Sequence, residues 1–148
     1  MTSGFPPDPT WDAWVEGTRQ GWRYELASLK HYLERYRGRD REVVYLRRRT
    51  PTARGEAWAR IMGPDGLGSR LPRGTPFIEE PPLQYAAIVD DPEGGLLRIS
   101  TEPCFGRDDV RDVTLWLAAY GADGRRMEDL RREWSGLLER LYPEGESV

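Results

Sequence analysis

The chain has one histidine, His31, and one cysteine, Cys104, and both side-chain types can act directly in catalysis. An imidazole acts as a general base, and a thiolate as a nucleophile, when a second group orients or activates it inside a pocket. His31 stands beside an apolar helical stripe, and Cys104 stands between two predicted strands. Because no activating partner is recognisable for either, we expect a partly exposed surface histidine, a buried or half-buried structural thiol, and no catalytic residue.

Metal and phosphate sites have equally little support. A single histidine and a single cysteine cannot supply the usual ligand set of a zinc site, so we expect no metal, and nothing indicates a cofactor. The glycine-rich segment 63–68 lacks the Lys-Ser/Thr pair of a phosphate loop. Adjacent carboxylates that fall in predicted turns occur three times, as Glu79-Glu80, Asp90-Asp91 and Asp108-Asp109. Neighbouring side chains at a strand end point apart, so we interpret these pairs as solvated.

The composition is that of one domain with a core. The chain has 148 residues, of which 38% are hydrophobic, including six tryptophans and seven tyrosines. A net charge of −3 gives no general attraction to nucleic acid or to an anionic membrane surface. No apolar run approaches the ~20 residues that span a bilayer, and the first residues do not resemble a signal peptide. We therefore expect a cytoplasmic protein that binds neither nucleic acid nor membrane.

The hydrophobic pattern predicts two long helices with strands between them. Apolar positions at steps of three, four and seven predict an amphipathic helix over 11–38, after a flexible arm at 1–10. A second periodic stripe predicts a helix over 125–142, capped by Asp123. Strands are predicted at 42–49, near 75–78, and at 83–89, 96–102 and 110–120, with a short helix at 53–62 capped by Thr52. Strands followed by a closing helix predict an α+β fold with an antiparallel sheet.

Both long helices contain the pattern Trp-x-x-x-Leu-x-x-Leu. The first copy is Trp22, Leu26 and Leu29, and the second is Trp134, Leu138 and Leu141. The two tryptophans lie 112 residues apart, about the length of one small domain. Two interpretations stay open: a tandem ancestor that lost most of its first domain, or a coincidence between two amphipathic helices.

Three segments carry a family resemblance. Residues 49–58 look like a first strand leading into a helix with a buried tryptophan, and residues 79–85 look like a Pro-Pro entry into a middle strand. Residues 114–117, followed by the second Trp/Leu pattern, look like a last strand and closing helix. In this order, residues 41–143 resemble the START-like or SRPBCC superfamily, the helix-grip fold, and within it the activator-of-heat-shock-ATPase-like and polyketide-cyclase-like bacterial branch. The short segment 68–76 suggests a curtailed sheet.

This resemblance implies a small hydrophobic ligand held between the sheet and the long C-terminal helix. The residues placed near that space are Trp58, Tyr85, Trp116, Trp134 and Leu138. Ordinary core packing is the alternative role for the same side chains. A cyclase- or aromatase-like enzyme and a chaperone-associated adaptor are further functions that the resemblance leaves open.

The helix over 11–38 precedes the family-like domain and is not an obligatory part of it. Its apolar stripe is too large for a lone helix in water, so another surface must cover it. We expect a homodimer through this helix, with helix exchange between subunits as one specific form. The residues expected at the interface are Trp11, Trp14, Val15, Trp22, Leu26, Leu29 and Leu33. The sequence thus predicts a non-enzymatic, dimeric protein.

Overall fold

The computed structural model describes residues 9–104 and 107–148, without the side chains of residues 9, 10, 13, 14 and 108. Most of the arm predicted at 1–10, and the side chain of Trp14, therefore lie outside the described residues. The helices are α1 (Pro9–His31), which continues as the π-helical turn η1 (Tyr32–Tyr36), α2 (Arg54–Met62) and α3 (Gly124–Leu141). The strands are β1 (Arg41–Thr50), β2 (Gly74–Glu80), β3 (Gln84–Val89), β4 (Gly95–Cys104), β5 (Arg107–Tyr120) and β6 (Glu146–Ser147).

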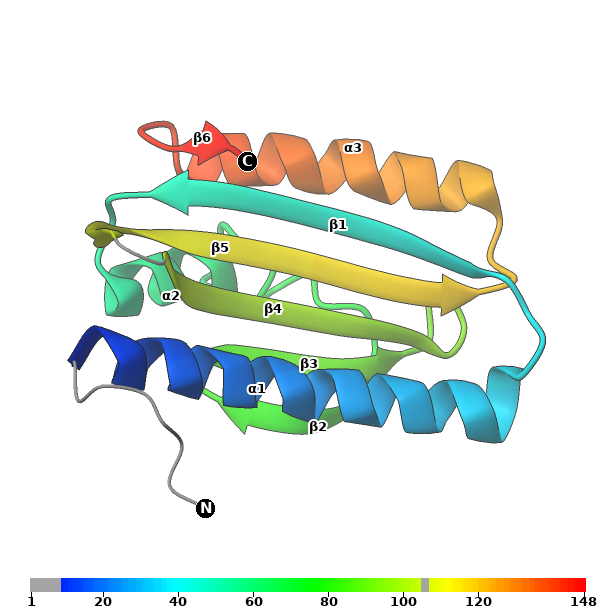
Figure 1. Ribbon diagram of the computed structural model, residues 1–148. Coiled ribbons are helices and arrows are strands. Elements are labelled where there is room, and N and C mark those ends of the chain that lie inside the picture. The colour runs from blue at the N-terminus through cyan, green and yellow to red at the C-terminus, as the bar shows by residue number, and fades with distance from the viewer. Residues whose placement is uncertain (1–8, 105–106) are drawn as a thin grey trace, which may run out of the picture.

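The strands form one antiparallel sheet in the order β2-β3-β4-β5-β1-β6. The first long strand, β1, lies beside the last long strand, β5, with Val44 opposite Leu117. α3 and α1 lie on opposite faces of this sheet, and both run along the strands (Figure 1). The predicted α+β class, with an antiparallel sheet and two long flanking helices, is confirmed.

The face of the sheet under α3 and α2 carries the larger hydrophobic core. Alternate residues of β5 face it, and these are Val113, Leu115, Leu117 and Ala119. α3 contributes a stripe at steps of three and four, made of Met127, Leu130, Trp134, Leu137 and Leu138. Asp123 caps this helix, because its Oδ1 accepts a hydrogen bond from the backbone N–H of Arg125 at 2.9 Å. The alternation in β5 and the stripe in α3 were both predicted from the sequence.

The opposite face carries a smaller aromatic core beneath α1. Tyr24 is fully buried there, together with Ile78, Leu96 and Tyr120. α1 lies over β4 and β3 and leaves β1 without a helix on this face (Figure 1). The α1–η1 helix ends where Gly38 takes a φ of 82°, which a residue without a Cβ adopts without strain. This half-covered face of the sheet is the part of the fold that leaves surface for function.

Candidate functional site

Four of the five residues proposed to line a ligand site lie on the α3 side of the sheet. Trp134 and Leu138 are buried members of the larger core, and Trp58 and Tyr85 pack against that core. These side chains are thus packed in or against the core between the sheet and α3, and their role toward a ligand stays a prediction.

Trp116 is the exception, and its placement corrects the sequence analysis. It lies on the α1 side, where its ring contacts Tyr24 and Tyr45 at centroid distances of 6.0 and 5.2 Å. Leu115 and Leu117 face α3, so the residue between them must face the other way. Trp116 therefore shares no space with Trp134.

His31 is buried, which corrects the expectation of a partly exposed histidine. Its Nε2–H donates a hydrogen bond to the backbone carbonyl of Gly94 at 2.9 Å, and its ring lies against Tyr36. The Tyr36 hydroxyl lies so close to the backbone of Gly94 that a Cβ at position 94 would overlap it. A glycine at this position therefore permits Tyr36 to pack beside His31. Held by a carbonyl and aromatic rings, His31 contributes to the packing of α1.

Cys104 is a buried free thiol, as expected. Its Sγ donates to Oδ1 of Asp112 at 3.2 Å, and the same carboxylate accepts two hydrogen bonds from Arg49. Burial, and then the Asp112 carboxylate, raise the pKa of the Cys104 thiol. The thiol is therefore protonated at neutral pH, which disfavours nucleophilic chemistry.

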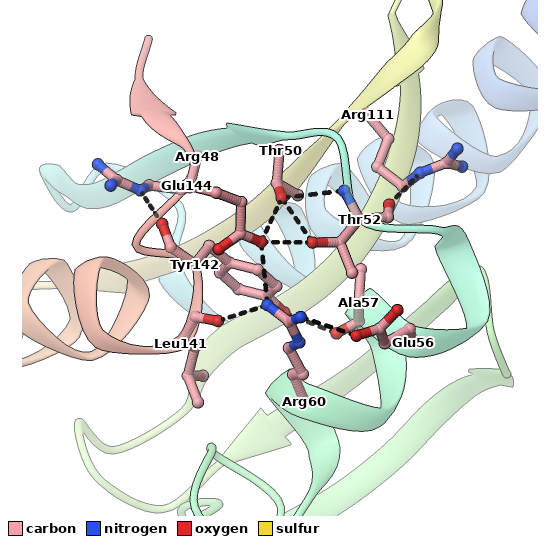
Figure 2. Close-up of polar contacts among 10 residues, drawn as sticks. All are labelled: Arg48, Thr50, Thr52, Glu56, Ala57, Arg60, Arg111, Leu141, Tyr142 and Glu144. Atoms are coloured by element: carbon pink, nitrogen blue, oxygen red, sulfur yellow. Dashed lines mark hydrogen bonds and ion pairs between the residues drawn. The ribbon is translucent and has the colours of Figure 1, made fainter.

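A polar cluster that the sequence did not indicate joins the C-terminal segment to the body of the domain (Figure 2). Glu144 accepts hydrogen bonds from the hydroxyls of Thr52 at 2.6 Å and Thr50 at 3.1 Å, and from Arg60 at 2.9 Å. These bonds, that of Thr52 first, lower the pKa of Glu144 to about 2. Arg60 also donates to the carbonyl of Leu141 at 3.0 Å.

The same cluster corrects the predicted cap of α2. Thr52 does not cap that helix, which begins after Ala53 without a side-chain hydrogen bond. Its hydroxyl is bound instead to Glu144, and this carboxylate comes from a segment 92 residues further along the chain. With its hydroxyls, guanidinium and carboxylate already paired, the cluster is a structural link between β1, α2 and the C-terminal segment rather than an open reaction site (Figure 2).

Most of the large hydrophobic side chains that the described residues expose lie on the outer face of the α1–η1 helix. Five of them are each 50–60% exposed, namely Val15, Trp22, Leu26 and Leu29 of α1 and Leu33 of η1. We call these five residues the α1 stripe. The face of α1 that packs on the sheet is a different one, made of Gln20, Tyr24, Ser28 and His31. At about 100° per residue, Leu26 and Leu33 point roughly opposite to Tyr24, so the helix turns its most apolar face away from its own domain.

Six of the seven residues predicted at a dimer interface can be placed. Five of them form the α1 stripe, and the sixth, Trp11, is only partly exposed. The seventh is Trp14, whose side chain lies outside the described residues. Five of the seven predicted residues therefore lie on the outer face of this helix, where the other described residues leave each of them at least half exposed.

A groove of about 420 Å³ runs beside the α1 stripe, where β1 begins and β5 ends. Trp22, Leu26 and Leu29 line it from the helix, and Tyr120 lines it from the sheet. Its polar lining includes Arg39 and Arg41. The volume falls in the range of small-molecule sites, about 300–1,000 Å³. The sequence predicted a cavity on the α3 side, whereas this groove lies on the opposite face of the sheet.

Comparisons with known proteins do not assign the chain to a group: no family model, no curated protein and no solved structure matches it. Within the described residues, no cluster of three or more histidine, cysteine or carboxylate side chains is arranged to hold a metal ion. No described helix combines the length and the apolar character needed to cross a bilayer. The geometry of α1 and the groove beside it is therefore the observation on which a function can be argued.

Proposed function

We propose that this protein is a non-enzymatic homodimer whose two copies associate through the α1 stripe. The observation that carries the proposal is the outward orientation of this stripe. A tryptophan and three leucines, each more than half exposed, stand on one helix face while Tyr24 of the same helix is fully buried. Contiguous apolar surface of this kind on a helix of a globular domain marks an interaction site.

The size of the stripe favours a second copy as the occupant. Its five side chains expose on the order of 500 Å² together, and a stable interface takes about 800 Å² from each partner. The remaining area comes from the polar side chains that flank the stripe. In a two-fold dimer the same patch serves both partners, so one stripe on each copy is sufficient.

The spacing within the stripe suits helix pairing. Leu26, Leu29 and Leu33 follow one another at steps of three and four, and Val15 and Trp22 are seven residues apart. Side chains at these steps form the seam along which two helices pack at a small crossing angle. Exchange of α1 between subunits is a less favoured form of the dimer, because the buried face of α1 already packs on its own sheet.

Sedimentation equilibrium of the full chain between about 1 and 100 µM tests this proposal. We expect a dimer of the intact protein and a monomer of the double variant Leu26→Glu, Leu29→Glu, because each copy would then place carboxylates in an apolar seam. Arg125→Glu is the matched control, since it adds a carboxylate at an exposed position of α3 and should leave the dimer unchanged. An intact chain that sediments as a compact monomer throughout this range would overturn the proposal.

The helix-grip relationship and the cytoplasmic location also remain proposals. A long C-terminal helix laid across an antiparallel sheet, with β1 beside the last long strand, supports the first. A lone cysteine kept as a buried free thiol supports the second, because a reducing compartment leaves such a thiol unmodified. Fractionation of the source cell tests the location; recovery outside the cytoplasmic fraction would count against it.

A further inference from the structure

We propose that the groove beside the α1 stripe binds an amphipathic carboxylate, a ligand with one anionic head and an apolar chain or ring system. Unlike the ligand site that the family resemblance implied, this site lies on the α1 face of the sheet. The groove shares Trp22, Leu26 and Leu29 with the α1 stripe, but its charged side, Arg39 and Arg41, lies outside the stripe, and the two proposals are tested by different measurements.

The anionic head is indicated by Arg39 and Arg41. Both residues line the groove, and neither forms an ion pair with another described residue. By contrast, Arg47, Arg49, Arg98 and Arg126 all have carboxylate partners. A guanidinium presents its N–H groups in a planar fork that matches the two oxygens of a carboxylate. Two such forks at one groove therefore favour an anion.

Arg41 is also held in position. Its guanidinium lies 5.7 Å from the centre of the Trp116 ring, against the sheet face that α1 leaves uncovered. Stacking of this kind keeps the flat group oriented while its edge N–H groups stay free to donate. The arginine is thus partly pre-organised, which reduces the entropy lost when it binds a ligand.

The apolar part of the ligand is indicated by the walls of the groove. Trp22, Leu26 and Leu29 form the helix side, and Tyr32 and Tyr120 lie toward the sheet. Tyr120 is fixed by a stacked contact with Tyr36, at a centroid distance of 4.9 Å and an interplanar angle of 13°. A cavity with aliphatic and aromatic walls and a few polar groups at one side is the usual form of a site for an amphipathic small molecule.

One carboxylate also lines the groove, that of Glu25. It opposes an anionic ligand, but two guanidinium groups against one carboxylate leave a net positive charge. A cationic amphiphile would be favoured only if Glu25 dominated the electrostatics of the groove. The charge of the head group that binds best, negative or positive, therefore tests directly whether the groove binds an anion.

Calorimetric titration at pH 7.5 tests the proposal with three probes: decanoate and decyltrimethylammonium below their critical micelle concentrations, and 1-decanol below its solubility limit. We expect decanoate to bind at least tenfold more tightly than decanol, and the ammonium compound more weakly than either. Raising the salt to about 0.5 M should weaken decanoate binding and leave decanol binding unchanged, because screening acts on the charged head alone. This second measurement needs no variant.

The double variant Arg39→Gln, Arg41→Gln should bring the affinities for decanoate and decanol within about twofold of each other. Arg37→Gln is the matched control, since it removes an exposed arginine of the same segment that does not line the groove. The proposal is overturned if decanoate does not bind up to millimolar concentration, if the ammonium compound binds best, or if the double variant keeps the preference for decanoate. Sedimentation of the same samples reports the dimer separately.

Discussion

Tyr24 donates a hydrogen bond from its Oη to the backbone carbonyl of Leu96 at 3.1 Å, and this bond joins the middle of α1 to β4. The ring is fully buried between Phe77 and Trp116. Nearby, His31 makes a second hydrogen bond from α1, to the carbonyl of Gly94 in the turn just before the same strand. Two side chains thus determine which face of α1 meets the sheet, and so which face is left for a partner.

Removing the Tyr24 hydroxyl should weaken the protein measurably. We expect Tyr24→Phe to lower the free energy of unfolding by about 0.5–1.5 kcal/mol, because the Leu96 carbonyl loses a buried donor. Tyr24→Ala should cost about 3–5 kcal/mol, since it also opens a cavity under α1. Urea unfolding gives both values. Tyr45→Phe should change stability by less than ~0.5 kcal/mol, because this ring is half-exposed and its hydroxyl forms no hydrogen bond with another described residue.

Trp22 and Trp134 stand in the same sequence pattern, yet they are 60% and 3% exposed. Trp134→Ala should lower the free energy of unfolding by about 3–5 kcal/mol, because it empties part of the larger core. Trp22→Ala should change it by less than ~0.5 kcal/mol in the Leu26→Glu, Leu29→Glu background, where the dimer does not contribute. In the intact background the same change should weaken the dimer. Comparable losses for both tryptophans in the monomeric background would contradict the described orientation of α1.

Glu144 should make stability depend on pH in the acid range. Its pKa is lowered to about 2 in the folded protein from an ordinary value of 4.5, so its contribution is present above pH 4.5 and is lost as the pH falls toward 2. We expect Glu144→Gln to lower the free energy of unfolding at pH 7 by about 0.5–1.5 kcal/mol, since the group is partly exposed. The difference in the free energy of unfolding between Glu144→Gln and the unmodified chain should vanish as the pH falls below about 2. Glu146→Gln, in the same segment, is the control, and its difference in the free energy of unfolding from the unmodified chain should not change with pH in this way.

Cys104 should resist thiol reagents in the folded state. Burial and the Asp112 carboxylate raise the pKa of its thiol, so both access and the thiolate fraction are low. We expect labelling with a maleimide at pH 7.5 to be at least ~100-fold slower in buffer than in 8 M urea. Rapid labelling of the folded chain would show that Cys104 is accessible and would contradict the described packing.

The local pattern of the sequence was sufficient to predict most elements. Alternation over 110–120 identified β5 and its two faces, and the stripe beginning at Met127 identified α3 and the side it buries. These features could be predicted because side chains repeat every two residues in a strand and every 3.6 in a helix, whatever the rest of the chain does. The strand β6 could not be predicted in this way, because its two residues are ordered only by pairing with Arg48 and Arg49.

Which surfaces meet depended on the folded arrangement of the whole domain. The pattern of α1 predicts that some surface covers Trp22 and Leu26, but the domain packs against the opposite face of the helix. There, Tyr24 and His31 donate hydrogen bonds to the carbonyls of Leu96 in β4 and of Gly94 in the turn before it. Thr52 had the pattern of a helix cap, yet its hydroxyl is bound to Glu144 from the far end of the chain. The local sequence pattern indicated the period and the apolar face of the longer helices and strands. The partner of each face depended on groups brought together by folding, which no local pattern records.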